Sequence, residues 1–202
     1  MIGSIILIVL GALALIGIGN GAVKDFGVPS IALVLVFAAI VGLNFLPVMT
    51  LGVFSFSWGT ALLVVTAFAL WLFRGTMKNK ITCLLLSIVL TGVLYGATRL
   101  AAYFGSGLWS TVNVYYALMI GFIAFLVTRN AKYGFIASVL CVVASTLLTQ
   151  IGSPLDLDAS YTPAVVASGL SVVAFCVVSA LIPKRPSKMS YYFETGRMSD
   201  RH

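Results

Sequence analysis

Few side chains in this sequence could do chemistry, and five of them are predicted to lie at one end of a helical bundle. Asn44, Asn113 and Gln150 stand at the ends of apolar runs, and Asp156 and Asp158 follow in a short acidic turn. Two carboxylates in one turn could attract a cation, and the amides beside them could extend a polar cluster. The same residues can equally serve as hydrogen-bond partners between helices and as a solvated loop, which is the interpretation we favour.

Residues typical of catalytic or metal sites are not grouped in this sequence. Its only histidine is the last residue, His202, and the apolar runs carry no lysine, histidine or carboxylate at mid-membrane depth. Cys83, Cys141 and Cys176 lie inside apolar runs and lack metal-ligand spacing, so we interpret them as small packing residues. Phosphate-binding and dinucleotide-binding motifs are missing as well. We therefore expect no enzyme activity and no cofactor.

The composition is that of a membrane protein. Of the 202 residues, 61% are hydrophobic and 8% are charged, whereas soluble domains carry about 25% charged residues. The mean hydropathy is +1.13. A net charge of +7 could indicate nucleic-acid binding. The cations, however, stand in loops and a tail beside apolar runs, so we expect membrane lipids as partners and no nucleic acid.

Seven apolar runs are predicted to cross a membrane as helices. A helix of about 20 apolar residues spans the hydrocarbon core, and the short turns between the runs make neighbours antiparallel. The runs are 2–19, 30–46, 58–73, 81–102, 112–127, 133–151 and 164–182. We therefore predict an all-α, polytopic transmembrane bundle over residues 1–183 and a basic tail over residues 184–202.

The segment 47–57 between the second and third runs is apolar but contains Pro, Gly and Ser. It could be a broken helix end, a partly re-entrant loop or an interfacial segment. We favour the interfacial segment, because Phe54, Phe56 and Trp58 suit the headgroup boundary.

The cations indicate which way the bundle faces. With seven spans, eleven of the twelve Lys and Arg residues fall on one side. These are Lys24, Arg74, Lys78, Lys80, Arg129, Lys132, Lys184, Arg185, Lys188, Arg197 and Arg201. Arg99 alone lies on the other side. Because Lys and Arg in short loops prefer the cytoplasm, we expect the amino terminus outside, the tail inside, and Asp156 and Asp158 outside.

Small residues recur at helical spacing in two runs. The sixth run contains Gly134, Ser138, Cys141, Ser145 and Thr149, and the fourth contains Ser87, Thr91, Gly92 and Gly96. Helices in lipid pack by close approach over small residues. We therefore predict that both sets are internal seams of the bundle.

The tail begins with the basic residues Lys184, Arg185 and Lys188. Each such cation contributes on the order of 1 kcal/mol of attraction to an anionic leaflet. We expect this segment to bind anionic lipid, with docking of a cytoplasmic protein partner as the other possibility.

Three stretches resemble a family of bacterial multi-pass membrane proteins that is defined only as a domain of unknown function. They are 26–33 (FGVPSIAL), 58–59 (WG) and 129–140 (RNAKYGFIASVL), and the likeness covers roughly residues 20–175. The family is common in spore-forming Gram-positive bacteria. The resemblance implies a location in the bacterial cell membrane.

The chain departs from that family at two polar places. The family tends to have Asn and paired Gly at 56–59, and an Asp-Gly pair within 159–163, where this chain reads FSWG and ASYTP. The resemblance therefore implies no activity. We expect a non-enzymatic membrane scaffold or assembly partner, in sporulation or envelope biology. The alternative is a small transporter or channel-like protein, with an outer cavity that touches Asn44, Asn113 and Gln150.

Overall fold

The computed structural model describes residues 2–16, 20–73, 75–104 and 114–181, and this part of the chain is mostly helical. Helix accounts for 81% of it, which confirms the predicted all-α class. The helices are α1 (Ile2–Ile16), α2 (Asn20–Phe26), α3 (Ser30–Leu43), α4 (Trp58–Leu72), α5 (Met77–Tyr103), α6 (Val114–Thr128), α7 (Ala131–Thr149) and α8 (Tyr161–Leu181), with a 3-10 turn, η1 (Asp158–Ser160), before α8. Three short strands, β1 (Met49–Leu51), β2 (Phe54–Phe56) and β3 (Leu155–Asp156), complete the described elements.

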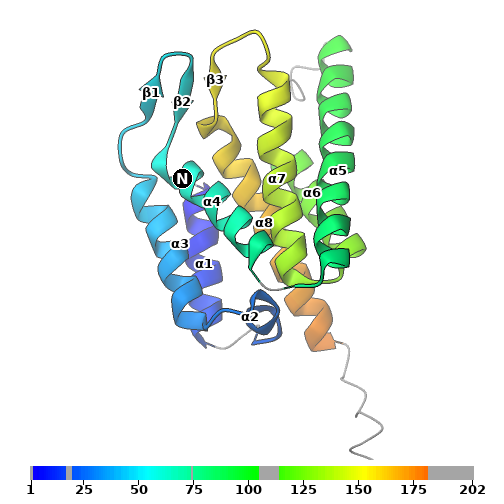
Figure 1. Cartoon of the computed structure of the whole chain (residues 1–202). Coiled ribbons are helices and arrows are strands. Elements are labelled where there is room, and N and C mark those ends of the chain that lie inside the picture. Colours follow the sequence, from blue (N-terminus) through cyan, green and yellow to red (C-terminus); the bar gives the residue numbers. More distant parts are fainter. Residues whose placement is uncertain (1, 17–19, 74, 105–113, 182–202) are drawn as a thin grey trace, which may run out of the picture.

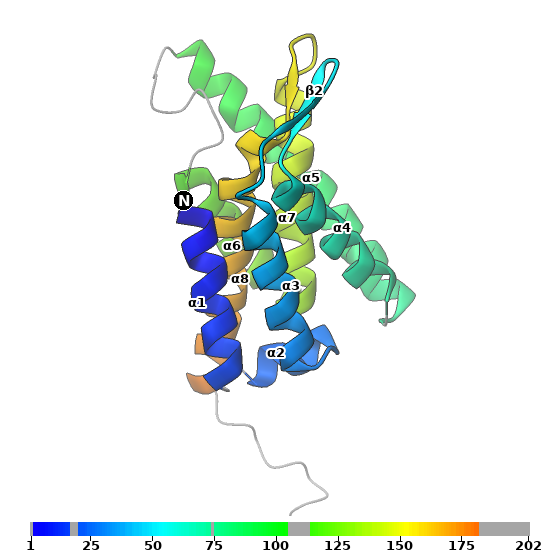
Figure 2. The same ribbon diagram turned by 90° about the vertical axis from the view of Figure 1, so that its left-hand side faces the viewer.

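The seven longer helices form one bundle, in which α5 and α7 run from one end to the other (Figures 1 and 2). One end carries the three strands, and we call it the sheet end. The other end carries α2, the turn between α4 and α5, and the turn between α6 and α7, and we call it the α2 end. The last residues of α8 also reach the α2 end, whereas α4 crosses the bundle obliquely in both views.

Three helices begin earlier than the apolar runs that predicted them, and one of these, α8, starts at Tyr161 rather than at residue 164. The run at 81–102 becomes α5, which starts at Met77 and includes Lys78 and Lys80. The run at 133–151 becomes α7, which starts at Ala131. The start of α7 is set by a cap rather than by hydropathy, because the Asn130 side chain accepts a hydrogen bond from the Tyr133 N–H.

Three helices are long and apolar enough to cross a membrane. They cover 77–103 (27 residues), 131–149 (19 residues) and 158–181 (24 residues). Four shorter apolar helices cover 3–16, 30–43, 58–72 and 114–128. At 1.5 Å per residue, a helix of about 15 residues extends roughly 22 Å, less than the roughly 30 Å of a hydrocarbon core.

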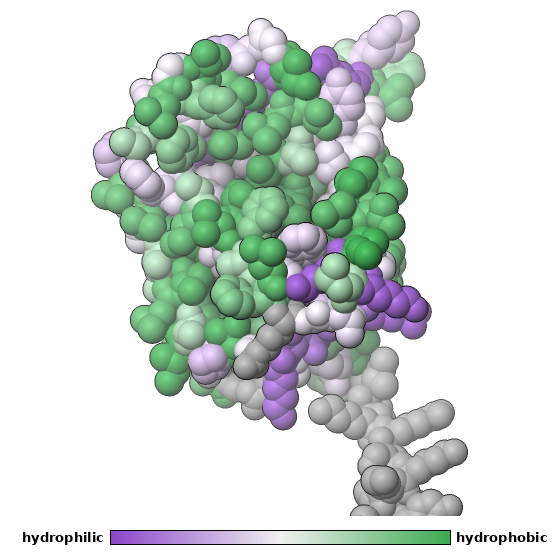
Figure 3. All heavy atoms as spheres, in the orientation of Figure 1, coloured by the Kyte–Doolittle hydropathy of each residue, from purple (hydrophilic) through white to green (hydrophobic). Residues whose placement is uncertain are grey.

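Large apolar side chains face outward along the bundle (Figure 3). On α5, Leu85, Ile88, Val89 and Val93 are all more than half exposed. α1, α3, α4 and α6 also carry exposed Ile, Leu, Val or Phe residues. Soluble monomers rarely expose contiguous apolar patches larger than a few hundred Å². The outer surface therefore agrees with the helix lengths in indicating association with a membrane.

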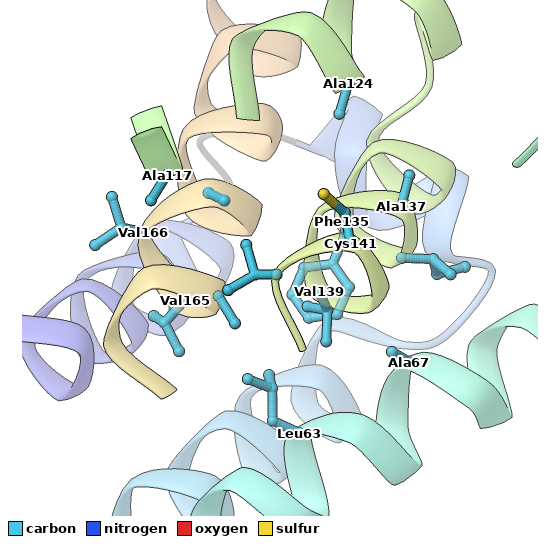
Figure 4. Packing of buried hydrophobic residues seen from close by; sticks show 14 of the residues in the cluster. Leu63, Ala67, Ala117, Ala124, Phe135, Ala137, Val139, Cys141, Val165 and Val166 are labelled. Carbon is cyan, nitrogen blue, oxygen red and sulfur yellow. The ribbon is translucent and has the colours of Figure 1, made fainter. Parts of the chain in front are cut away.

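Helix α7 is buried on nearly every side. From Ala131 to Val139 every residue is buried, and Val142 on the next turn is fully buried. α4, α5, α6 and α8 all pack against it. Figure 4 shows Leu63 and Ala67 of α4 on one side of α7 and Ala124 of α6 on another. α7 thus organises the bundle as its central helix.

Close helix approaches occur where glycine faces another helix. A Cβ atom on Gly121 of α6 would overlap the Ala167 carbonyl oxygen of α8, and one on Gly134 of α7 would overlap the Ser171 Oγ of α8. Ser138 Oγ donates to the Gly134 carbonyl at 2.8 Å, so its hydroxyl is satisfied inside its own helix. The predicted seam along the sixth run is confirmed, although α7 is buried well beyond it.

The predicted seam along the fourth run is only half correct. Ser87 and Thr91 are buried, and Thr91 Oγ1 lies 3.5 Å from the Cys141 carbonyl oxygen of α7. Gly92 and Gly96 lie on another face of α5, where an added Cβ would meet no atom within 4 Å. The four residues lie close together in the sequence, but each residue of a helix is rotated by about 100° from the previous one, which places them on two different faces.

The segment 47–57 contains a β-hairpin, which none of the three sequence alternatives specified, and its interfacial position stays a prediction. β1 pairs with β2 antiparallel, and β2 pairs with β3 in parallel, so that Phe54 lies beside Leu155. The hairpin turn contains Gly52 at a φ of 64°, a conformation that favours glycine. Pairing with β3, about a hundred residues away, supplies hydrogen bonds that the local sequence did not reveal.

We predict that Gly121→Ala will destabilise the protein, because the added methyl group must push α6 away from α8. Overpacking of this kind costs roughly 1–3 kcal/mol. Thermal unfolding in detergent measures the effect. Gly92→Ala is the matched control, since it places the same methyl group in open space on another helix. Equal melting temperatures for the two variants would contradict the close approach of α6 and α8.

Candidate functional site

Gln150 and the acidic turn form one compact hydrogen-bonded unit at the sheet end. The Gln150 side chain bonds both backbone groups of Asp156. Its Nε2 donates to the Asp156 carbonyl at 3.1 Å, and its Oε1 accepts from the Asp156 N–H at 2.7 Å. An amide side chain can replace a strand partner in this way, because it offers one donor and one acceptor side by side. Gln150 thus anchors β3 to the end of α7.

The Asp156 carboxylate is engaged by two donors. Its Oδ1 accepts from Ser55 Oγ at 3.1 Å and from the Asp158 N–H at 3.0 Å. Ser55 comes from β2, so this contact ties the hairpin to the acidic turn. Asp156 and Asp158 are both half-buried. The turn predicted as a solvated loop is therefore an ordered element, and Ser55 is a member of the cluster that the sequence analysis did not select.

Asn44 takes part in a different set of contacts. Its Oδ1 accepts from Ser57 Oγ at 3.0 Å, while Ser57 caps α4 by accepting from the Thr60 N–H at 3.2 Å. A Cβ on Gly59 would lie 2.7 Å from the Asn44 Cβ, so α3 and α4 meet closely here. Asn44 therefore joins the end of α3 to the start of α4, whereas Gln150 joins α7 to β3.

Four of the predicted site residues lie outside the described part of the chain. They are Asn113, in the predicted outer cluster, and Lys184, Arg185 and Lys188, in the predicted lipid-binding tail. Within the described residues, the structure brings Gln150, Asp156 and Asp158 together and gives Asn44 separate partners. Two apolar cavities are lined by residues of α1, α2, α3 and α8, and neither lining includes Asn44, Gln150 or the acidic turn.

Lys132 is a charged side chain that the sequence analysis placed in the wrong element. Predicted as part of a polar loop, it lies in the first turn of α7 and is 4% exposed. Its Nζ donates to the Phe73 carbonyl at 2.6 Å and lies 5.7 Å from the Tyr133 ring centroid. The carbonyl groups at a helix C-terminus carry partial negative charge, which favours a cation there. The Asn130 cap two residues earlier was the sequence signal that placed Lys132 inside a helix.

A second lysine completes the same contact at the end of α4. Lys80 Nζ donates to the Leu72 carbonyl at 2.7 Å, and the Lys80 carbonyl accepts from Trp71 Nε1 at 3.2 Å. The last carbonyls of α4 are thereby satisfied by cations from α5 and α7. The contact joins three helices at the α2 end.

Asp25 on α2 supports the start of α7. Its Oδ2 accepts from the Ala131 N–H at 3.3 Å, which satisfies one of the unpaired donors of the first turn. Burial raises the pKa of the Asp25 carboxyl above its ordinary value, and the hydrogen bond from Ala131 opposes that shift. α2 is thus attached to the central helix by a polar contact as well as by the packing of Phe26 on Phe135.

The remaining chemistry-bearing groups are packed inside the bundle. Cys83 and Cys141 are buried and Cys176 is half-buried, and all three are free thiols, in agreement with a packing role. Among the described residues, no group of three or more His, Cys, Asp or Glu side chains is placed to hold a metal ion. Ser171 Oγ is buried without a hydrogen-bond partner at its close contact with Gly134.

No protein-family model matches this chain, and no match was found among curated proteins or among solved structures.

We predict that Lys132→Met will lower thermal stability, because the Phe73 carbonyl would lose a buried donor. A hydrogen bond to a charged group contributes roughly 1.5–3 kcal/mol. Unfolding in detergent, followed by circular dichroism, measures the change. Lys78→Met is the matched control: it removes the same charge from an exposed position near the same turn. If both variants melt alike, Lys132 does not hold α4 to α7.

Proposed function

We propose that this chain is an integral protein of the bacterial cytoplasmic membrane that crosses the bilayer seven times and acts as a non-enzymatic scaffold or assembly partner. In this arrangement the amino terminus and the sheet end face outward, and the α2 end and the tail face the cytoplasm. The resemblance to a family from spore-forming bacteria makes sporulation and envelope assembly the first settings to examine.

The observation that carries this proposal is the separation of charge between the two ends. Among the described residues, Lys24, Lys78, Lys80, Arg129 and Lys132 all belong to elements at the α2 end. Arg99, Asp156 and Asp158 belong to the sheet end. Cations collect on the cytoplasmic side of membrane proteins. The tail leaves α8 at the α2 end, which supports contact of Lys184, Arg185 and Lys188 with the anionic inner leaflet.

The number of spans is supported by the arrangement of helices. α1, α3, α4 and α6 are shorter than the hydrocarbon core, but they lie in the same bundle as the three long helices. Short spans are accommodated by local thinning of the bilayer and by polar flanking residues that reach the interface. A seven-span arrangement also keeps the basic turns on one side.

A scaffold is supported by the use made of the polar residues. Gln150, Asp156 and Asn44 are engaged in hydrogen bonds that join elements of the sheet end. Lys132 and Asp25 join helices at the α2 end. Transport would need polar groups along a path through the bundle. The cavities lined by α1, α2, α3 and α8 supply no such groups, which favours a scaffold over a transporter.

The sidedness is tested by labelling introduced cysteines in intact cells with a membrane-impermeant maleimide. Ser153→Cys and Thr76→Cys both change exposed residues, one at each end of the bundle. We expect Ser153→Cys to be labelled in intact cells and Thr76→Cys only after permeabilisation. The parent protein, with Cys83, Cys141 and Cys176, supplies the background signal. Labelling of Thr76→Cys in intact cells would reverse or refute the orientation.

The scaffold role is tested against transport by reconstitution into liposomes loaded with a potential-sensitive dye. A scaffold should leave the membrane as resistant to Na⁺ and K⁺ as empty liposomes. Asp156→Asn is the informative variant, since it alters the charge at the outer cluster and keeps an acceptor for Ser55. An ion flux in the parent protein that Asp156→Asn reduces would overturn the scaffold in favour of a conducting path.

A further inference from the structure

An apolar cavity of about 170 Å³ lies at the α2 end, between α1, α2, α3 and α8. Its inner wall includes Leu10 of α1, Phe26 of α2, and Leu33 and Phe37 of α3, all of which are buried. The half-buried Cys176 thiol is the least apolar group in its lining. An engineered apolar cavity of about 150 Å³ in another protein stays dry and takes up benzene or xenon. The cavity therefore suits a hydrocarbon group.

The inner wall is a fixed aromatic surface. Phe26 packs edge-on against Phe135 of α7, with ring centroids 5.7 Å apart, and Phe37 stacks on the same ring at 6.3 Å. Phe135 belongs to the central helix and is fully buried. Since three helices share these ring contacts, the wall is built into the core and does not depend on a loop.

The mouth of the cavity lies on the outer surface of the bundle. Val173 and Val177 of α8 line it and are 38% and 51% exposed. They are one turn apart on the same helix, and Leu13 of α1 lines the cavity as a half-buried residue. If the exposed apolar surface faces lipid, acyl chains are the molecules that reach this mouth.

Charge at the same end favours a particular headgroup. α2 lines the cavity with Ala22 and Val23, and the next residue, Lys24, is exposed. Asp25, the one acidic residue of the described part of this end, accepts a hydrogen bond from the Ala131 backbone. A cation beside an apolar cavity at the membrane surface matches an anionic headgroup with its acyl chain.

We propose that the cavity binds one acyl chain of an anionic membrane lipid, whose headgroup lies at Lys24. The site rests on the proposed membrane embedding, and it adds a specific lipid as the ligand of the α1–α2–α3–α8 side of the bundle. The chain enters past Val173 and Val177 and lies against the wall formed by Phe26 and Phe37.

The test uses the full-length protein in liposomes that contain a trace of phosphatidylglycerol with a diazirine in its acyl chain. After irradiation, mass spectrometry maps the label onto peptides. We expect label on the inner wall at Leu10 and Leu33, and general label on the outer face of α5. Val173→Trp blocks the mouth, and it should lower inner-wall labelling about tenfold, the loss expected when roughly two methylene groups are no longer buried.

Val178→Trp is the matched control, because it puts the same side chain at an exposed position of α8 that does not line the cavity. It should leave inner-wall labelling unchanged. Phosphatidylcholine with the same diazirine chain should label the inner wall less than phosphatidylglycerol does. Lys24→Gln should remove this difference in labelling between the two lipids. Lys78→Gln, which removes an exposed cation from the first turn of α5, should preserve it.

The outcomes separate this site from the proposed function. Label on α5 without label on the inner wall would overturn the cavity site and leave the membrane embedding intact. Absence of label from α5 as well would overturn the embedding itself. Equal inner-wall labelling by both lipids, or labelling that Val173→Trp does not reduce, would overturn the proposed binding of an anionic lipid.

Discussion

The structure depends on the packing of α7 on nearly all of its sides. A helix in lipid gains no hydrophobic stabilisation from contact with another helix, because lipid tails are as apolar as leucine. Its neighbours must instead gain dispersion energy by close approach. Gly121 lets the backbone of α8 approach α6, and Gly134 makes room on α7 for the Ser171 side chain of α8. Ser138 adds a small side chain whose hydroxyl is satisfied within its own helix. The other helices take their places around this contact.

The ends of the helices impose a second requirement. The first N–H groups and the last carbonyl groups of each helix lack intrahelical partners, and unpaired polar groups are costly near hydrocarbon. Lys80 and Lys132 satisfy the end of α4, and Asp25 and Asn130 satisfy the start of α7. At the sheet end, the Gln150 side chain and the β2–β3 pairing instead satisfy backbone groups of the short strands. Most of the polar side chains that looked available for chemistry are used in this way.

This use of polar residues explains what the sequence could and could not predict. Apolar runs and small-residue spacing predicted the helices and the seam along α7, because both arise from local periodicity. The pairing of Phe54 with Leu155 could not be predicted, since it joins segments about a hundred residues apart. Lys132 was assigned to a loop because a charged residue interrupts an apolar run. The helix nevertheless begins before Lys132, because the Asn130 side chain caps it. The grouping of Asn44 with Gln150 failed because being at the same end of a bundle does not imply contact.

The bundle is closely packed in one region and contains apolar cavities in another, and this difference bears on where a ligand could bind. Around Gly121 and Gly134, backbone and small side chains of α6, α7 and α8 touch closely, and an extra methyl group has no space. Elsewhere in the bundle, apolar cavities are lined by α1 and α3, and one of them is also lined by α2 and α8. Atoms that line an empty cavity lack neighbours on one side and therefore lose dispersion energy. A bound ligand or a shift of a helix can restore those contacts. The α1–α2–α3 side is connected to the central helix by the hydrogen bond between Asp25 and Ala131 and by the contacts of Phe26 and Phe37 with Phe135. The close-packed side then supplies a fixed frame, and the side with cavities is where the proposed lipid would bind.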